Sequence, residues 1–371
     1  MTGLGLNIHV RAKRLRPVSL KPIKHLLFLS LTLVGLYVTF LGISATKINH
    51  TKHQVSLDGA RGFGIALGLF ASEPSWDYGG LLEEISALGV SQVMIVIPLH
   101  QASIYSNTPS LGVGLDRIRT TIRQAQSLSL QVSLMPIIKL QKRQINEWRG
   151  KLAPNKEKIW WSNYRIELKR LATLATRQGV QRLVIGAELC SLEGQYERWV
   201  GLITDLRVRF KGLLSYSANW DHYLKIKYWS LLDEIAVTAY FPISERSKFE
   251  HLWHSYIDKI EHFASRHHRP LLITEYGYPA LDSAMKQPWN ETSGAAFNSK
   301  LQADLVTGAT QIILERMSVV QNQPKTKGIL KGAFLWNWFG FGAQSDHGFT
   351  LRGREGEVTL KLLLASLKEN Q

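Results

Sequence analysis

After about residue 60, the sequence alternates between short apolar runs rich in β-branched residues and longer amphipathic stretches. Runs that are apolar throughout, such as VMIVIPL at residues 93–99, are typical of parallel strands buried on both faces. The runs begin near Gly62, Gln92, Gln131, Arg182, Leu213, Glu234, Pro270 and Gly332. The predicted helices span residues 79–88, 115–128, 163–178, 196–210, 248–266, 295–320 and 358–368. This pattern predicts an α/β fold, a (β/α)8 TIM barrel, in one domain over residues 61–371.

The N-terminal region predicts a membrane anchor. Residues 26–45 contain no charged side chain, and twenty helical residues match the thickness of a bilayer's hydrocarbon core. Residues 1–25 carry six lysines and arginines and no acid, so they form a basic cytoplasmic tail under the positive-inside rule. Residues 46–60 then form a linker, and the barrel lies on the extracytoplasmic side, periplasmic or extracellular. A cleaved signal peptide remains the alternative, although its apolar region is usually only about 7 to 15 residues long.

The charge and the motifs of the sequence exclude several classes of partner and cofactor. The formal net charge is +16, but the basic residues are scattered and form no compact patch with aromatics, so nucleic acid is not expected. Cys190 is the sole cysteine, which excludes an internal disulfide, and a lone thiol is more often a small hydrophobe than a nucleophile. No HExxH motif, paired-cysteine ligand set or dinucleotide fingerprint occurs, so neither a metal nor a cofactor is predicted.

Two carboxylates each close a strongly apolar run. Glu188 ends the run LVIGAE and Glu275 ends the run LLITE. On the strand count above, these runs are the fourth and seventh strands, whose tips face each other across the mouth of a barrel. Barrel enzymes keep their chemistry at the carboxyl ends of their strands, so the pair predicts an active site. Two carboxylates at one pocket are typical of glycosidases.

Three segments add a resemblance to a known family. They read IGAEL at residues 185–189, ITEYGYP at 273–279, and FLWNWFG followed by SDHGFTLRGR at 334–354. Their order and spacing resemble glycoside hydrolase family 113, in clan A of the retaining glycosidases, whose characterised members are β-mannanases. The resemblance covers roughly residues 60–368. It implies a double displacement in which Glu275 is the nucleophile and Glu188 the acid/base.

Other strand-end residues are candidates for binding the sugar. Resemblance to clan A implies a tryptophan floor beneath the scissile sugar, for which Trp336 is favoured over Trp338. It also implies a tyrosine, Tyr240, hydrogen-bonded to the nucleophile. The remaining polar or aromatic candidates are His100, Lys139, Asn219, Trp220 and Asp346. Each of these could instead make a hydrogen bond within its loop or be exposed to solvent.

One position departs from the clan pattern. Most of the clan carries asparagine immediately before the acid/base glutamate, where it contacts the 2-hydroxyl of the reacting sugar, and this chain has Ala187. The departure bears more on the sugar than on the reaction type, because mannose and glucose differ at that carbon.

The sequence therefore predicts a membrane-anchored retaining glycosidase that cleaves an oligo- or polysaccharide with β linkages, β-mannan favoured. The alternatives are a non-catalytic glycan-binding barrel in polysaccharide assembly and a transglycosylase that uses the same site. The carboxylate pair favours an enzyme, since a binding protein needs neither acid.

Overall fold

The structure is a computed structural model, and it describes residues 62–73, 75–318, 329–344 and 346–369. The predicted tail, anchor and linker at residues 1–60 lie outside these ranges. Within them, no helix combines the length and apolar character needed to span a membrane.

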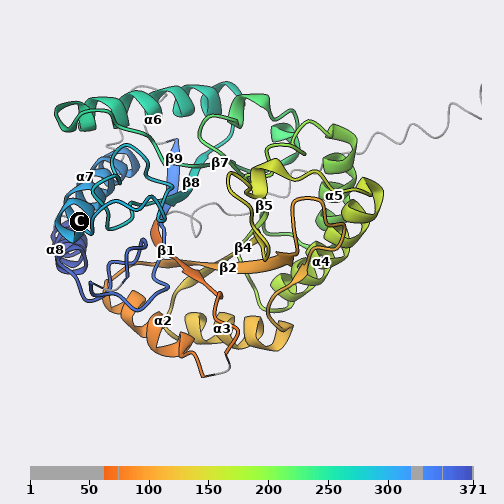
Figure 1. Cartoon of the computed structure of the whole chain (residues 1–371). Coiled ribbons are helices and arrows are strands. Elements are labelled where there is room, and N and C mark those ends of the chain that lie inside the picture. Colours follow the sequence, from red (N-terminus) through yellow and green to blue (C-terminus); the bar gives the residue numbers. More distant parts are fainter. Residues whose placement is uncertain (1–61, 74, 319–328, 345, 370–371) are drawn as a thin grey trace, which may run out of the picture. The chain divides into compact units, whose positions relative to one another are not determined.

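Eight parallel strands close into a barrel, as the sequence predicts (Figure 1). Each pairs with its neighbours around the ring, and the pairing of the first strand with the second closes it. In chain order these strands are β1 (Gly62–Gly68), β2 (Gln92–Gln101), β4 (Gln131–Leu140), β5 (Arg182–Ala187), β6 (Leu213–Ala218), β7 (Ile235–Thr238), β8 (Leu271–Tyr276) and β9 (Leu330–Leu335). A two-residue strand, β3 (Ser110–Leu111), pairs antiparallel with the end of β2 and was not predicted.

Helices surround the barrel (Figure 1). They are α2 (Tyr78–Ala87), α3 (Leu115–Ser127), α4 (Glu157–Arg177), α5 (Tyr196–Arg209), α6 (Phe249–Arg266), α7 (Ser299–Met317) and α8 (Glu355–Glu369). Short 3-10 helices occupy some loops: η3 (Arg149–Lys151), η4 (Tyr223–Lys225), η5 (Trp229–Leu231) and η6 (Arg246–Lys248). In α3, for example, Ile118, Thr121, Ile122 and Ala125 are buried, and this spacing of three and four residues places one apolar face against the strands.

Two apolar layers hold the barrel together. Alternate strand residues, among them Met94, Val96 and Phe334, fill the interior as one cluster. The intervening residues, such as Ile95, face the helices and join a larger cluster. Side chains of a strand alternate between its two faces, so a strand that serves both layers is mainly apolar along its length.

Several predicted boundaries shift. The helix predicted from residue 163 begins at Glu157, because Trp160, Trp161 and Tyr164 already bury one face of its first turns. The helix predicted from residue 295 begins at Ser299, where the Asn298 side chain caps it by accepting the backbone N–H of Leu301. These shifts leave the strand count unchanged. Glu188 therefore follows the fourth barrel strand, β5, and Glu275 lies in the seventh, β8.

Candidate active site

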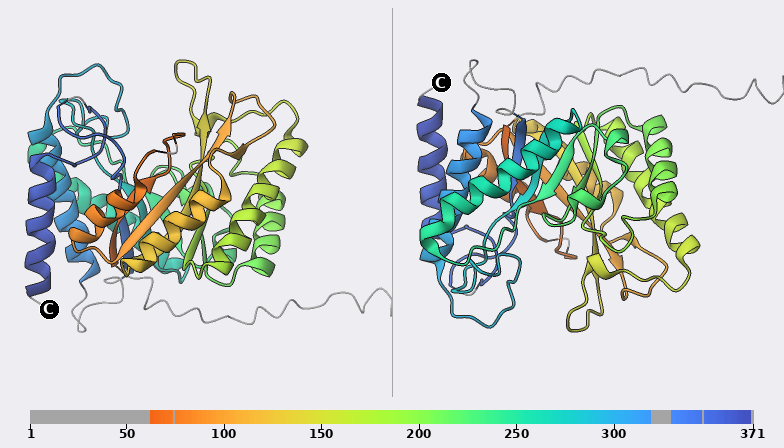
Figure 2. Two further views of the ribbon diagram at one scale, coloured as in Figure 1. Left: turned by 90° about the horizontal axis from the view of Figure 1, so that it is seen from below. Right: turned by 90° about the horizontal axis from the view of Figure 1, so that it is seen from above.

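A cleft of about 1010 Å³ opens at the carboxyl end of the barrel strands. The loop after β4, through residues 143–149 and 151, lines it together with residues 289–292, which follow β8. Both segments rise from the same end of the barrel in the two views of Figure 2. Glu188 and Glu275 both line this cleft, so the fold brings together two residues that lie far apart in the sequence.

Glu188 is held in an unusual backbone conformation just beyond the end of β5. Its φ is +52°, in the left-handed region that a residue other than glycine rarely adopts. The β5–β6 register shifts between Val184 and Ala187, and the Glu188 N–H donates to the carbonyl of Ser217 at 2.8 Å. A bulge of this kind redirects a side chain next to an active site. The Glu188 side chain is nearly buried, and the Thr238 hydroxyl donates to its Oε1 at 2.8 Å.

The two carboxylate oxygens of Glu275 differ in their hydrogen bonding. Its side chain is 1% exposed, and the hydroxyl of Tyr240 donates to its Oε2 at 3.0 Å. This is the hydrogen bond that the resemblance implied. The other oxygen, Oε1, is buried and has no hydrogen-bond partner among the described residues. Its lone pairs are therefore available to an incoming atom.

Arg149 contacts both glutamates from η3. One nitrogen, Nη2, lies 2.6 Å from Oε2 of Glu188 and 4.0 Å from Oε2 of Glu275. The separation of those two oxygens cannot exceed the sum of the two distances, 6.6 Å. The carboxylates therefore share one pocket around one positive charge.

The environment of Glu275 disfavours its charged form. Burial raises the pKa of Glu275 to about 7, and the nearby Glu188 adds to that effect. Arg149 and the Tyr240 hydroxyl act in the opposite direction and lower this pKa. A pKa raised by burial and a neighbouring acid, in a cleft, is characteristic of catalytic carboxylates.

Cys190, two residues after Glu188, lacks the surroundings of a nucleophilic thiol. Burial and the neighbouring carboxylates of Glu193 and Glu188 raise its pKa. A nucleophilic cysteine needs the opposite effect, because the thiolate is the reactive form.

A family model named Glycoside Hydrolase Family 113 matches residues 82–349. The chain belongs to glycoside hydrolase family 113. It is a glycoside hydrolase built on the TIM barrel of clan A. A search of curated proteins finds no match.

Solved structures of family 113 enzymes share this fold. A complex of a family 113 β-1,4-mannanase has a TM-score of 0.71 at 20% identity, covering 82% of this chain and 98% of that one. The β-mannanase from Alicyclobacillus acidocaldarius, in complex with ManMIm, has a TM-score of 0.69 at 19% identity, covering 82% and 97%. A family 5 glycoside hydrolase variant from Bifidobacterium longum, in complex with Manβ1-4GlcNAc, has a TM-score of 0.56 at 14% identity, covering 82% and 78%.

Four predicted binding residues line the cleft with the glutamates. They are Tyr240, Trp336, Asn219 and Trp220. The partly exposed Trp336 follows β9 and packs against Phe70, with the ring centroids 6.1 Å apart. Trp220 packs edge-on against Phe241 and Tyr256. Their positions suit contact with a sugar, which stays a prediction.

Four other predicted residues do not line the cleft. Trp338 is fully buried, and its indole N–H donates to Glu84 of α2 at 2.7 Å, so it packs between barrel and helix. His100 lies against the loop at Gly112, where an added Cβ would come within 2.7 Å of its ring. Asp346 accepts the backbone N–H groups of residues 341, 342 and 348, and thereby fixes its own loop. The weaker candidate Lys139 does not line the cleft but lies near it, with its ammonium 4.7 Å from the centroid of the Phe70 ring, which packs against Trp336.

Several residues of the site were not predicted from the sequence. Arg149 and Thr238 contact the glutamates directly, while Trp148, Trp289 and Glu291 line the cleft. Trp289 is 52% exposed, as a ring that stacks on a sugar must be. The tryptophans in the loops after β4 and β8 could have indicated a sugar-binding role for these loops. Nothing in the sequence indicates, however, that the two loops meet.

Proposed function

We propose that this chain is a retaining glycosidase that cleaves β-linked mannan, with Glu275 as nucleophile and Glu188 as acid/base. The observation that carries the proposal is the buried pair of glutamates at the fourth and seventh strand tips, both in contact with Arg149. Retaining glycosidases keep their two carboxyl groups about 5 to 5.5 Å apart and inverting ones about 6.5 to 9.5 Å apart. The two Oε2 atoms lie at most 6.6 Å apart, at the short end of the inverting range or below it, and this supports retention.

The proposed first step uses the two oxygens of Glu275 differently. Tyr240 holds Oε2, and the unpartnered Oε1 attacks the anomeric carbon. Glu188 gives its proton to the departing glycosidic oxygen, so the leaving sugar departs as a neutral alcohol. In the second step, Glu188 takes a proton from water, and the resulting hydroxide displaces Glu275 with a second inversion.

β-1,4-mannan is the proposed substrate class, because the family 113 structures that this chain resembles are β-mannanases. Flat rings also suit the C–H faces of sugars, and Trp148, Trp220, Trp289 and Trp336 line the cleft. Asn219 follows β6, the strand next to β5, and lines the cleft, which supports assigning it a polar contact that the alanine at position 187 cannot make.

Azide rescue tests the two assigned roles separately. Glu188→Ala should still cleave an aryl β-mannoside with a good leaving group, and azide should then yield the β-glycosyl azide. Glu275→Ala should be inactive until azide replaces the nucleophile, which gives the α-glycosyl azide. Both outcomes follow from the face of the sugar that each carboxylate occupies.

Glu291→Gln provides a matched control, because Glu291 is also an acid that lines the cleft. Its activity should stay within a few-fold of the parent. Loss of activity in this variant, with full activity in either strand-tip variant, would reassign the chemistry. Product analysis with and without an added sugar acceptor separates hydrolysis from transglycosylation.

We further propose that the chain is held in a membrane by residues 26–45, with the barrel on the extracytoplasmic side. The support is the uncharged stretch and the basic residues before it. Carbonate extraction of membranes from expressing cells should leave the full-length chain in the pellet, and added protease should reach the barrel from the extracytoplasmic side. Release as a shortened soluble product would instead indicate a cleaved signal peptide.

A further inference from the structure

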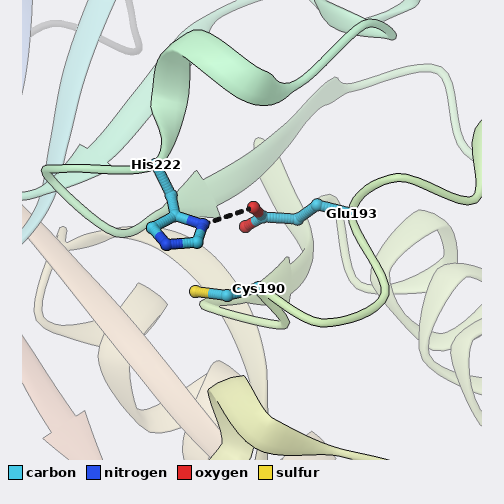
Figure 3. Close-up of side chains that lie close together, drawn as sticks. All are labelled: Cys190, Glu193 and His222. Atoms are coloured by element: carbon cyan, nitrogen blue, oxygen red, sulfur yellow. Dashed lines mark hydrogen bonds and ion pairs between the residues drawn. The ribbon is translucent and has the colours of Figure 1, made fainter.

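A cluster of three potential metal ligands lies beside the catalytic acids. Cys190 and Glu193 come from the loop between β5 and α5, and His222 comes from the loop after β6 (Figure 3). One potential ligand atom from each of them lies within 4.8 Å of the other two. Nδ1 of His222 is 3.3 Å from Oε2 of Glu193, and the thiol of Cys190 points toward this pair (Figure 3).

The ligand atoms need little movement to surround one ion. Bond lengths of about 2.0 to 2.3 Å in a tetrahedral zinc site place neighbouring ligand atoms about 3.3 to 3.6 Å apart. Rotation of the partly exposed Cys190 and His222 side chains can close the remaining gap, since the backbone already brings the two loops together.

Glu193, the buried member of the cluster, is oriented by a hydrogen bond from a residue outside the cluster. Glu193 is 3% exposed, and its Oε1 accepts the hydroxyl of Tyr216 at 2.8 Å. That same hydroxyl accepts the backbone N–H of Leu189 at 2.8 Å. Metal sites commonly orient their ligands by outer hydrogen bonds of this kind. Oε2 of Glu193 is left to face His222.

Three carboxylates lie near the Cys190 thiol, and Arg149, which pairs with Glu188, is a positive charge beside them. Besides Glu193, the carboxylates of Glu188 and Asp221 act electrostatically on the Cys190 thiol. A cation placed among them would offset this repulsion. Asp221, which precedes His222, lines the cleft, and Cys190 and His222 are themselves partly exposed, so an ion can reach the cluster from solvent.

We propose that Cys190, Glu193 and His222 bind a divalent zinc-like ion. Sulfur, imidazole nitrogen and carboxylate oxygen together suit zinc and its borderline neighbours, whereas magnesium and calcium prefer oxygen alone. On binding, the thiol gives up its proton to solvent and the ion takes the place of the hydrogen bond between His222 and Glu193. The ion joins the β5–α5 loop to the loop after β6. Its binding is independent of the proposed function.

Cobalt provides a direct test, because Cys190 is the sole cysteine in the sequence. Co²⁺ is added to chelator-treated full-length protein in detergent, and a thiolate-to-cobalt charge-transfer band in the near ultraviolet can arise only from Cys190. We expect this band to saturate at one Co²⁺ per chain and Zn²⁺ to abolish it by displacement. Absence of the band in folded wild-type protein would overturn the proposal, whatever the variants do.

Three variants complete the test. Cys190→Ser should lose the band, and His222→Ala should weaken binding of Co²⁺ and Zn²⁺ by at least about 10-fold. His251→Ala removes an exposed histidine of α6, outside the cluster, and should bind like wild type. Equal Zn²⁺ affinity in wild type, Cys190→Ser and His222→Ala would place the ion elsewhere and refute the assignment.

Discussion

Replacing Glu275 by glutamine should stabilise the folded chain at alkaline pH while abolishing hydrolysis. The carboxyl is 1% exposed, and its pKa is about 7 in the fold against an ordinary value of 4.5. The folded state therefore binds the proton more tightly than the unfolded chain. As pH rises from 4.5 to about 7, the unfolded chain loses this proton first, and the fold loses stability.

The size of the effect follows from that difference in pKa. At about 1.4 kcal/mol for each pKa unit, ionised Glu275 lowers the free energy of unfolding by about 3 kcal/mol above pH 7. Glutamine keeps an oxygen to accept the Tyr240 hydroxyl but carries no charge. For a barrel of this size, about 3 kcal/mol corresponds to a rise of about 6 °C in Tm.

Thermal unfolding at a fixed scan rate, from about pH 4 to about pH 9, measures this effect. The gain in Tm of Glu275→Gln over wild type should be near zero at the acidic end, grow with pH, and level off above about pH 7. Glu83→Gln, an exposed change on α2, should show no such growth. A gain of equal size at every pH, or a loss of stability at about pH 8, would refute the reasoning.

Further predictions concern the groups around the nucleophile and the two tryptophans. Wild-type kcat/KM should fall as pH drops below about 7, because Glu275 must be ionised to attack. Tyr240→Phe and Arg149→Met each remove a group that lowers the pKa of Glu275. The acid limb of the pH–rate profile should therefore move to higher pH in both, and an unmoved limb would exclude either group as a tuner of the nucleophile. Trp336→Ala should reduce kcat/KM by at least about 10-fold, since it removes a ring from the cleft. Trp338→Phe should lower stability by about 1 to 3 kcal/mol, through a lost hydrogen bond and a core gap, with KM unchanged. A raised KM in Trp338→Phe, without a loss of Tm, would contradict its placement in the core.

The barrel and its two glutamates were predictable because strand periodicity and strand order are local signals. A run buried on both faces is apolar throughout, and counting such runs places Glu188 and Glu275 on the fourth and seventh strands. The resemblance to family 113 then assigned a role to each. The resemblance also implied the hydrogen bond from Tyr240 to Glu275, which the structure contains.

Contacts made by loops were not predictable in the same way. Arg149 reaches both glutamates only because the loop after β4 turns into η3 at that point. Trp338 is only two residues from Trp336, yet a hydrogen bond to Glu84 directs it into the core instead of the cleft. Nothing in the sequence around either tryptophan distinguishes these two environments.

The cluster of Cys190, Glu193 and His222 illustrates the same limit. No motif joins a histidine to a cysteine 32 positions earlier in this sequence. Their proximity depends on the pairing of β5 with β6 and on the turns that follow each strand. Metal sites are predicted from sequence by motifs with fixed local spacing. Ligands that come from two separate loops have no such spacing, so the sequence does not reveal them.

Glu275 is proposed to form a covalent bond to the sugar while Glu188 moves the proton. Mass spectrometry of the protein after incubation with a 2-deoxy-2-fluoro β-mannosyl substrate carrying a good leaving group tests it most directly. We expect one added glycosyl group on the peptide that contains Glu275, and no such addition in Glu275→Gln. A label on any other residue, or turnover that releases an inverted product from unlabelled enzyme, would contradict it.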